Sequence, residues 1–216
     1  MIKEIYFAQL DKANMFFKAT SKVDPADVPK RFAKYVMPAR KLVEENCSVA
    51  ITCDWFKLDE VPLTGEMPAR VFAGCDRVLC YVATLRGYEE LCKSEELQDE
   101  MLLSFFVDSW GRAFVEAATT VIGDLADEEA KDCGGTRTHS WCPGQHNFDL
   151  SNQRVLFALL KPEEIGCTLS DSLLMHPIKS ASGVVGVMTD GEAELIKPCD
   201  FCPHTETCPS HKCSAI

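Results

Sequence analysis

The stretch 97–122 limits how this chain can fold more than any other part of the sequence. Its apolar side chains recur at helical spacing and cover most sides of the expected helix: Leu102, Phe106, Trp110, Ala113, Phe114, Ala117 and Val121. A helix that is apolar on most sides is buried by its neighbours. One polar stripe interrupts it, since Asp108, Arg112 and Glu116 lie at i, i+4 and i+8. The sequence therefore predicts a central helix with one polar face.

The remaining segments mix helical and strand patterns. Helices are expected over 4–19, 27–46 and 149–160. Pro38 is expected to bend or break the second helix. Strands are expected over 48–53, 78–84, 165–169 and 182–188, with a hairpin turn at Asp190-Gly191 and a polar connection over 124–135. Because strands and helices alternate without a repeated strand–helix–strand order, the pattern predicts an α+β fold.

Composition limits the class of partner and the compartment. The chain has 216 residues, of which 46% are hydrophobic, enough for one domain with a real core or one domain plus an appendage. Its net charge of -11 argues against nucleic acid as the main partner. Neither an apolar run of membrane-spanning length nor a secretory leader pattern is seen, so we expect no membrane partner and a cytoplasmic location.

Cysteine is abundant, with twelve residues in the chain. A cytoplasmic protein keeps its thiols reduced. Six of them lie in apolar surroundings and are expected to be small core residues: Cys47, Cys53, Cys75, Cys80, Cys92 and Cys167.

The carboxyl-terminal segment contains a second group of cysteines. Cys199, Cys202, Cys208 and Cys213 follow the pattern C-x2-C-x5-C-x4-C. Four thiolates at such short spacing complete the shell of an iron–sulfur cluster or of a structural zinc ion. His204 and His211 keep a Cys3His zinc site open, and a tail without metal is the third alternative. The expected organisation is a helical segment 1–46, a core 47–196 and a Cys-rich tail 197–216.

Two segments after the central helix carry a family resemblance. They are Ser140-Trp-Cys-Pro-Gly-Gln-His and the stretch 165–183. They resemble the activation (reactivation) domain of cobalamin-dependent methionine synthase, and more closely its small free-standing relatives, some of which end in a cysteine cluster. The positions in register are Pro143, Gly144, Gly166, Leu169, Ser172, Met175, Pro177, Ser180, Ser182 and Gly183. The resemblance covers roughly residues 45–190 and implies a twisted, mainly antiparallel sheet with helices.

The resemblance also implies a function. Members of this family bind S-adenosylmethionine and present it to a cobalamin bound elsewhere. One electron reduces cob(II)alamin to cob(I)alamin, and the sulfonium methyl group is then transferred to it. The implied role is therefore a reactivation factor that takes a small-molecule methyl donor and docks on a corrinoid protein carrying the cobalamin.

Individual residues match the family's ligand site in part. Pro143 and Gly144 match a loop that lies along the ligand, and Glu116 matches an acid that contacts its amino group, a pairing that suits a carboxylate. Alternatively, Glu116 pairs with Arg112. Gln145 stands where the family has Tyr, and Ser140 where it has an Arg that grips the ligand's carboxylate. Arg137, three residues earlier, is the candidate replacement, and His139 is an alternative.

These departures leave two other functions open. The first is a binding module of the same fold, without methyl transfer, for a corrinoid protein or small ligand. The second is a structural protein whose tail is stapled by zinc. No residue is predicted to be catalytic.

Overall fold

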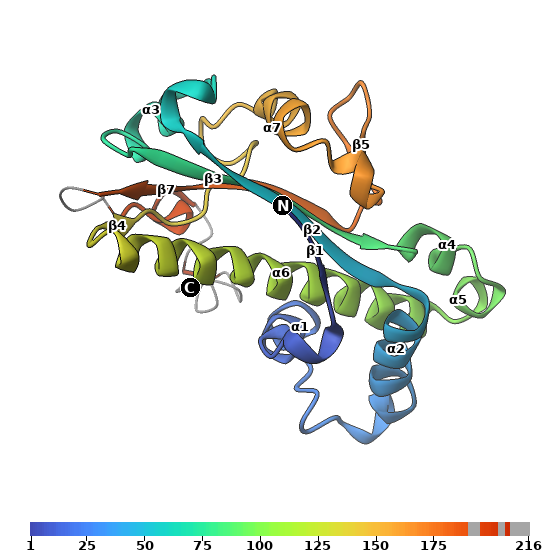
Figure 1. Cartoon of the computed structure of the whole chain (residues 1–216). Helices are drawn as coiled ribbons and strands as arrows, with labels where there is room; N and C mark the ends of the chain where they lie inside the picture. The colour runs from blue at the N-terminus through green and yellow to red at the C-terminus, as the bar shows by residue number, and fades with distance from the viewer. Residues whose placement is uncertain (190–194, 203–205, 208–216) are drawn as a thin grey trace.

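A computed structural model describes residues 1–189, 195–202 and 206–207. Within them lies a five-stranded antiparallel sheet in the order β1-β2-β3-β7-β4, with β5 and β6 forming a separate two-stranded ribbon. The strands are β1 (Ile2–Ile5), β2 (Ser48–Lys57), β3 (Arg77–Arg86), β4 (Thr136–Arg137), β5 (Thr168–Leu169), β6 (Met175–His176) and β7 (Ser180–Met188). The expected α+β fold is confirmed (Figure 1).

Helices cover both faces of the sheet (Figure 1). The α-helices are α1 (Ala13–Ser21), α2 (Ala33–Asn46), α3 (Glu66–Val71), α4 (Tyr88–Cys92), α5 (Glu95–Asp99), α6 (Met101–Asp132) and α7 (Asn152–Leu160). The 3-10 turns are η1 (Phe7–Gln9), η2 (Lys30–Phe32), η3 (Leu58–Glu60), η4 (Pro162–Ile165) and η5 (Pro198–Phe201). None of the described helices combines the length and apolarity needed to cross a bilayer.

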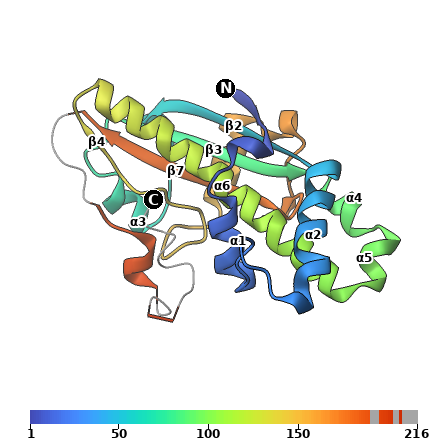
Figure 2. The ribbon, with the colours of Figure 1, turned by 90° about the horizontal axis from the view of Figure 1, so that it is seen from below.

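Helix α6 is the centre of the larger core. One of its sides packs on β3 and β7, and α1 and α2 pack on its other sides (Figure 2). Trp110 and Phe114 are fully buried, and Phe17 of α1 stacks on the Trp110 ring at 3.9 Å between centroids. This arrangement confirms the buried central helix and explains why it is apolar on most sides.

The bounds of α6 differ from the prediction. The 97–122 stretch is divided between α5 and α6, and α6 continues to Asp132 through the expected polar connection. Ala126 and Ala130 are buried and extend the apolar side, while Asp124 and Glu128 face solvent. The buried alanines thus extend the helix beyond 122. The acidic residues on its outer face made this part of the sequence look like a polar connection.

The amino-terminal residues also depart from the prediction. The helix expected over 4–19 is confirmed only from Ala13, where α1 begins, and its start is instead strand β1, which pairs with β2 over Ile2↔Thr52 to Ile5↔Val49. Pairing with a strand distant in sequence outweighs the local helical pattern. Pro38 does not end α2, since Val36, Ala39 and Val43 are fully buried around it. Burial of the two valines at about 1.5–3 kcal/mol each offsets the roughly 3 kcal/mol cost of an internal proline.

Most of the predicted strands are confirmed, and β2 and β3 are longer than expected. The segment 165–169 contains the end of η4 and only a short strand, because its pairing is limited to β6. The turn at Asp190-Gly191 lies outside the described residues. Five of the six expected core cysteines are buried, but Cys92 is exposed at the end of short helix α4, which has its apolar side at Tyr88 and Leu91.

The buried cysteines predict a loss of stability at alkaline pH. Burial raises the pKa of the Cys80 thiol to about 12, whereas an unfolded chain has a thiol pKa of about 8.5. Above that value the unfolded state binds fewer protons, so stability falls as pH rises, by up to about 1.4 kcal/mol per pH unit for one group. We expect Cys80→Ala to flatten the slope of unfolding free energy between about pH 9 and about pH 11, measured by urea unfolding.

Cys133→Ala is the matched control, because Cys133 is exposed and its thiol is solvated in both states. Equal slopes for wild type and Cys80→Ala would contradict the assignment of Cys80 as a buried neutral thiol.

Candidate functional site

A cavity of about 250 Å³ lies on the α6 side of the sheet. Helix α6, the segment after β4, turn η5 and one side chain of α1 form its walls. The lining residues are Phe16, Glu116, Thr119, Thr120, Gly123, Arg137, His139, Ser140, Gln145, Pro198 and Cys199. Segments from both halves of the chain therefore converge on this cavity.

The α6 wall is one helical face. Glu116, Thr119, Thr120 and Gly123 are spaced at i, i+3, i+4 and i+7, which aligns them on one side of a helix. The hydroxyls of Thr119 and Thr120 donate to the carbonyls of Glu116 and Ala117, both at 2.8 Å. Each hydroxyl oxygen keeps acceptor capacity toward the cavity.

The opposite wall is an irregular continuation of β4 along β7. Trp141 pairs with Val184 through two backbone hydrogen bonds of 3.0 and 2.9 Å, and its ring is buried in the α7-side core. Its neighbour Ser140 lies on the α6 side, because side chains alternate across a strand. The Ser140 hydroxyl is 2.9 Å from the hydroxyl of Tyr81, whose ring crosses the backbone of its β7 partner Gly183.

Cys142 belongs to the same wall. Its sulfur is 3.9 Å from the Tyr81 hydroxyl, and burial raises the pKa of the Cys142 thiol and of the Tyr81 phenol. Both groups therefore stay neutral at physiological pH. The thiolate is the reactive form of cysteine, so a Cys142 thiol held protonated next to Tyr81 is a structural contact of this wall.

The charged groups of the cavity have partners on the protein. Glu116 accepts a bond from Arg112 at 2.7 Å, as the helical spacing predicts. Arg137 makes two bonds to the Asp127 carboxylate, at 2.6 and 2.9 Å. The side-chain oxygen of Gln145 accepts the Cys142 backbone N–H at 3.0 Å, which leaves its amide NH2 to donate.

Several residues selected from the sequence share this cavity. Glu116, Arg137, Gln145 and the first tail cysteine, Cys199, all line it. Pro143 and Gly144 do not: Pro143 is buried and Gly144 forms an exposed turn with φ of 92° whose N–H bonds to the Phe148 carbonyl. They shape the loop that brings Gln145 to the cavity.

Other lining residues were not singled out from the sequence. Thr119 and Thr120 follow Glu116 by three and four positions, and this spacing is the signal that identifies them. Phe16 carries no such signal, because the packing of α1 against α6 brings it to the cavity from a distant part of the chain.

The tail begins at the cavity. Turn η5 packs the Phe201 ring 6.3 Å from Trp141 and 6.0 Å from His146, between centroids. The N–H of Cys202 bonds to the Cys199 carbonyl at 3.2 Å, and both side chains are partly buried. Cys208 and Cys213 lie outside the described residues. In the part of the chain that is described, no group of three or more His, Cys, Asp or Glu side chains has the arrangement of a metal site.

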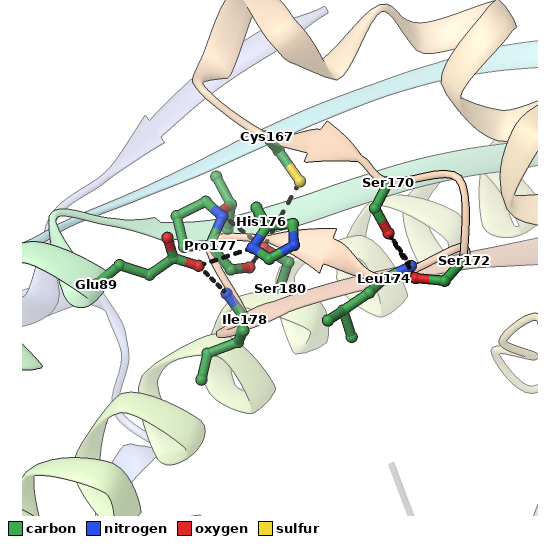
Figure 3. A network of polar contacts seen from close by, with 10 residues as sticks. Glu89, Cys167, Ser170, Ser172, Leu174, His176, Pro177, Ile178 and Ser180 are labelled. Carbon is green, nitrogen blue, oxygen red and sulfur yellow. Dashed lines mark hydrogen bonds and ion pairs between the residues drawn. The ribbon is translucent and has the colours of Figure 1, made fainter.

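A second polar network holds the stretch 165–183, which carries part of the family resemblance (Figure 3). One oxygen of Glu89, on α4, is 3.1 Å from His176 Nδ1 and accepts the Ile178 N–H at 3.2 Å. Ser180 donates to the Pro177 carbonyl at 2.6 Å and is 2.8 Å from the Thr84 hydroxyl. The network fixes the β5–β6 ribbon to α4 and β3 beside a cavity of about 300 Å³.

Comparisons with known proteins support the fold. No protein-family profile matches the sequence, and no curated protein does either. Among solved structures, the chain is similar to a crystal structure of the MetH reactivation domain bound to AdoHcy, with a TM-score of 0.57 and 15% sequence identity. The match covers 90% of this chain and 80% of that one. The chain therefore shares the fold of a reactivation domain.

The Glu89 network yields a prediction about local stability. Glu89→Ala removes an acceptor from the Ile178 N–H, and we expect that amide to exchange with deuterium about fivefold faster. This corresponds to the roughly 1 kcal/mol contribution of such a bond. Glu90→Ala, at the exposed neighbouring acid, is the control. Unchanged exchange at Ile178 in Glu89→Ala would show that the contact does not hold the ribbon.

Proposed function

We propose that this protein is a reactivation factor for a corrinoid protein and that the α6 cavity binds S-adenosylmethionine. The observation that carries the proposal is the convergence of Glu116, Arg137 and Gln145 on one cavity in a fold similar to a reactivation domain bound to AdoHcy. AdoHcy, S-adenosylhomocysteine, is the product left when S-adenosylmethionine gives up its methyl group.

The cavity's side chains match the chemistry of this ligand. Its amino-acid end carries an ammonium and a carboxylate, which suit Glu116 and Arg137. Its hydroxyls and ring nitrogens suit Thr119, Thr120 and the Gln145 amide. Phe16 offers an apolar ring for the nucleoside. These groups hold the donor, and the reaction needs its sulfonium methyl carbon to face the cobalt of the partner.

The bond between Glu116 and Arg112 does not block ligand binding. The two side chains are 30% and 52% exposed, and exposed i,i+4 pairs contribute only about 0.3–0.5 kcal/mol. A bond between a carboxylate and a ligand ammonium contributes about 1.5–3 kcal/mol. The ligand's ammonium therefore displaces Arg112 at a net gain.

The partner supplies the cobalamin, and the protein's share is positioning. Reduction of cob(II)alamin to cob(I)alamin consumes one electron. The reduced cobalamin of the partner would supply the nucleophile for the sulfonium methyl carbon, and the thioether would be the leaving group. Because methyl transfer removes the reduced state, a correctly placed donor makes an unfavourable reduction proceed.

The tail is proposed to hold a metal centre through Cys199, Cys202, Cys208 and Cys213. Of these four, Cys199 lies in turn η5 and lines the cavity, and the N–H of Cys202, the residue after the turn, bonds to the Cys199 carbonyl. An iron–sulfur cluster bound there would supply single electrons at low potential, whereas zinc would only stabilise the tail. Thiolate ligands accept either metal.

A binding module without methyl transfer is the second candidate. Ser140 and Gln145 favour it, because they stand where the resembled family has an Arg and a Tyr. Transfer of a labelled methyl group from S-adenosylmethionine to a reduced corrinoid distinguishes the two functions.

Glu116 is the first residue to test. We expect the wild type to bind S-adenosylhomocysteine in isothermal titration calorimetry and Glu116→Ala to bind it about 10- to 100-fold more weakly, because a charge-assisted bond is lost. Asp124→Ala is the matched control, since Asp124 is an exposed acid of the same helix outside the cavity. Absence of binding to the wild type at millimolar ligand would contradict the proposed methyl donor.

The tail is tested by its metal content. Anaerobically purified protein is expected to contain iron and sulfide and to show absorption near roughly 400 nm that dithionite bleaches, as thiolate-bound clusters do. Cys199→Ser combined with Cys202→Ser should abolish it, while Cys133→Ser, outside the motif, should not. Stoichiometric zinc in a colourless protein would support the structural alternative, and absence of both metals would reject a metal-binding tail.

A further inference from the structure

Arg137 is held in place before any ligand arrives. Its Nε and Nη2 donate to the two oxygens of Asp127 at 2.6 and 2.9 Å, and its Nη1 donates to the Thr138 carbonyl at 3.2 Å. The Arg137 side chain is only 17% exposed. A bidentate pair of this kind fixes the plane of the guanidinium as well as its position.

The guanidinium also lies close to the α6 backbone. An added Cβ at Gly123 would be 3.6 Å from its Nη2, so the group passes beside the helix where no side chain intervenes. Asp127 follows Gly123 by one helical turn. The helix thus provides both the space for the guanidinium and the carboxylate that orients it.

Part of the guanidinium stays available to a ligand. It has five N–H donors, and three are used in the bonds above, so two remain among the described contacts. Arg137 lines the α6 cavity, whereas Asp127 does not. The carboxylate therefore holds the group without itself lining the cavity.

We infer that Asp127 is a positioning residue: it fixes Arg137 as the carboxylate-recognising cation of the cavity and so sets selectivity for ligands with an amino-acid end. This rests on the proposed function. The cation that recognises the ligand's carboxylate is then Arg137, which Asp127 of α6 holds in place. Ser140 cannot take this role, because it carries no charge and its hydroxyl is bonded to Tyr81.

Asp127 affects Arg137 both by fixing its position and by its negative charge. The two effects predict opposite changes in ligand affinity when Asp127 is removed. If only charge mattered, removing a nearby carboxylate would strengthen the attraction of Arg137 for an anionic ligand. If position matters, the freed arginine gains rotamer entropy of up to about 2 kcal/mol that the ligand must remove, and affinity falls. The sign of the change therefore identifies the mechanism.

The experiment compares two ligands by titration calorimetry. S-Adenosylhomocysteine carries the amino-acid end, and 5′-methylthioadenosine lacks it. We expect Asp127→Ala to lower the affinity for S-adenosylhomocysteine about tenfold with little change for 5′-methylthioadenosine. The selectivity ratio is the affinity for S-adenosylhomocysteine divided by that for 5′-methylthioadenosine. Arg137→Ala should also lower this ratio. The double variant should lower it no further than Arg137→Ala alone, because both residues act as one unit. Asp127→Glu should restore part of the ratio.

The control and the contrary outcomes separate this inference from the proposed function. Glu128→Ala, at the exposed neighbouring acid, should leave both affinities unchanged, and circular dichroism checks that all variants fold. Equal weakening for both ligands, no change, or tighter binding in Asp127→Ala would overturn the positioning role while leaving the proposed function intact. Failure of the wild type to bind either ligand would overturn both.

Discussion

The burial of α6 from several sides is the constraint on which the rest of the structure depends. One side of the helix packs on β3 and β7 and other sides on α1 and α2, so that Trp110, Phe114 and Ala118 have no access to solvent. Such a helix has little freedom to rotate about its axis, because protein interiors are close-packed. Rotation would also move its acidic side chains into the core, where burial of an unpaired charge is costly. Whatever polar residues α6 carries are therefore presented in fixed directions. The stripe from Glu116 to Gly123 owes its position in the cavity to the packing on the other sides of the helix.

The cavity has walls of different origin. The α6 wall is regular and rigid, whereas the segment after β4 follows β7 irregularly, with paired backbone at Trp141 and a loop that turns at Gly144, where φ is positive. Irregular backbone next to a rigid element is a common way to place side chains that bind ligands. Cross-strand contacts hold this segment, above all the Tyr81 hydroxyl against Ser140. The proposed binding site needs both parts, since the helix sets the direction of its groups and the loop sets their chemistry.

The local sequence pattern was sufficient to predict the helix and strands of the core. It was not sufficient to predict the edge strand β1 or the end of α6. The central helix, β2, β3 and β7 were predictable because their periodicity and their burial agree. Strand β1 was not, since its pairing with β2 is distant in sequence, and the last turns of α6 were not, since acids cover their outer face. For the candidate site, Glu116 and Gln145 were selected from the family pattern and Arg137 as a cation near it, and all three line one cavity. Phe16 could not be found, because the packing of α1 on α6 brings it near, and Asp127 could not, because the helix was expected to end at 122.

The low identity to the reactivation domain is consistent with a shared fold because a core demands pattern and volume more than particular residues. A ligand site is less tolerant, since a bidentate cation cannot be replaced by a hydroxyl. A chain that keeps the fold while placing Ser at the family's arginine position must either give up the ligand or recover the cation from elsewhere. Arg137 and Asp127 face each other across the α6–β4 contact, and a cation already oriented there costs the ligand little ordering entropy. The second route is open to this chain because α6 is held rigidly enough to orient that cation.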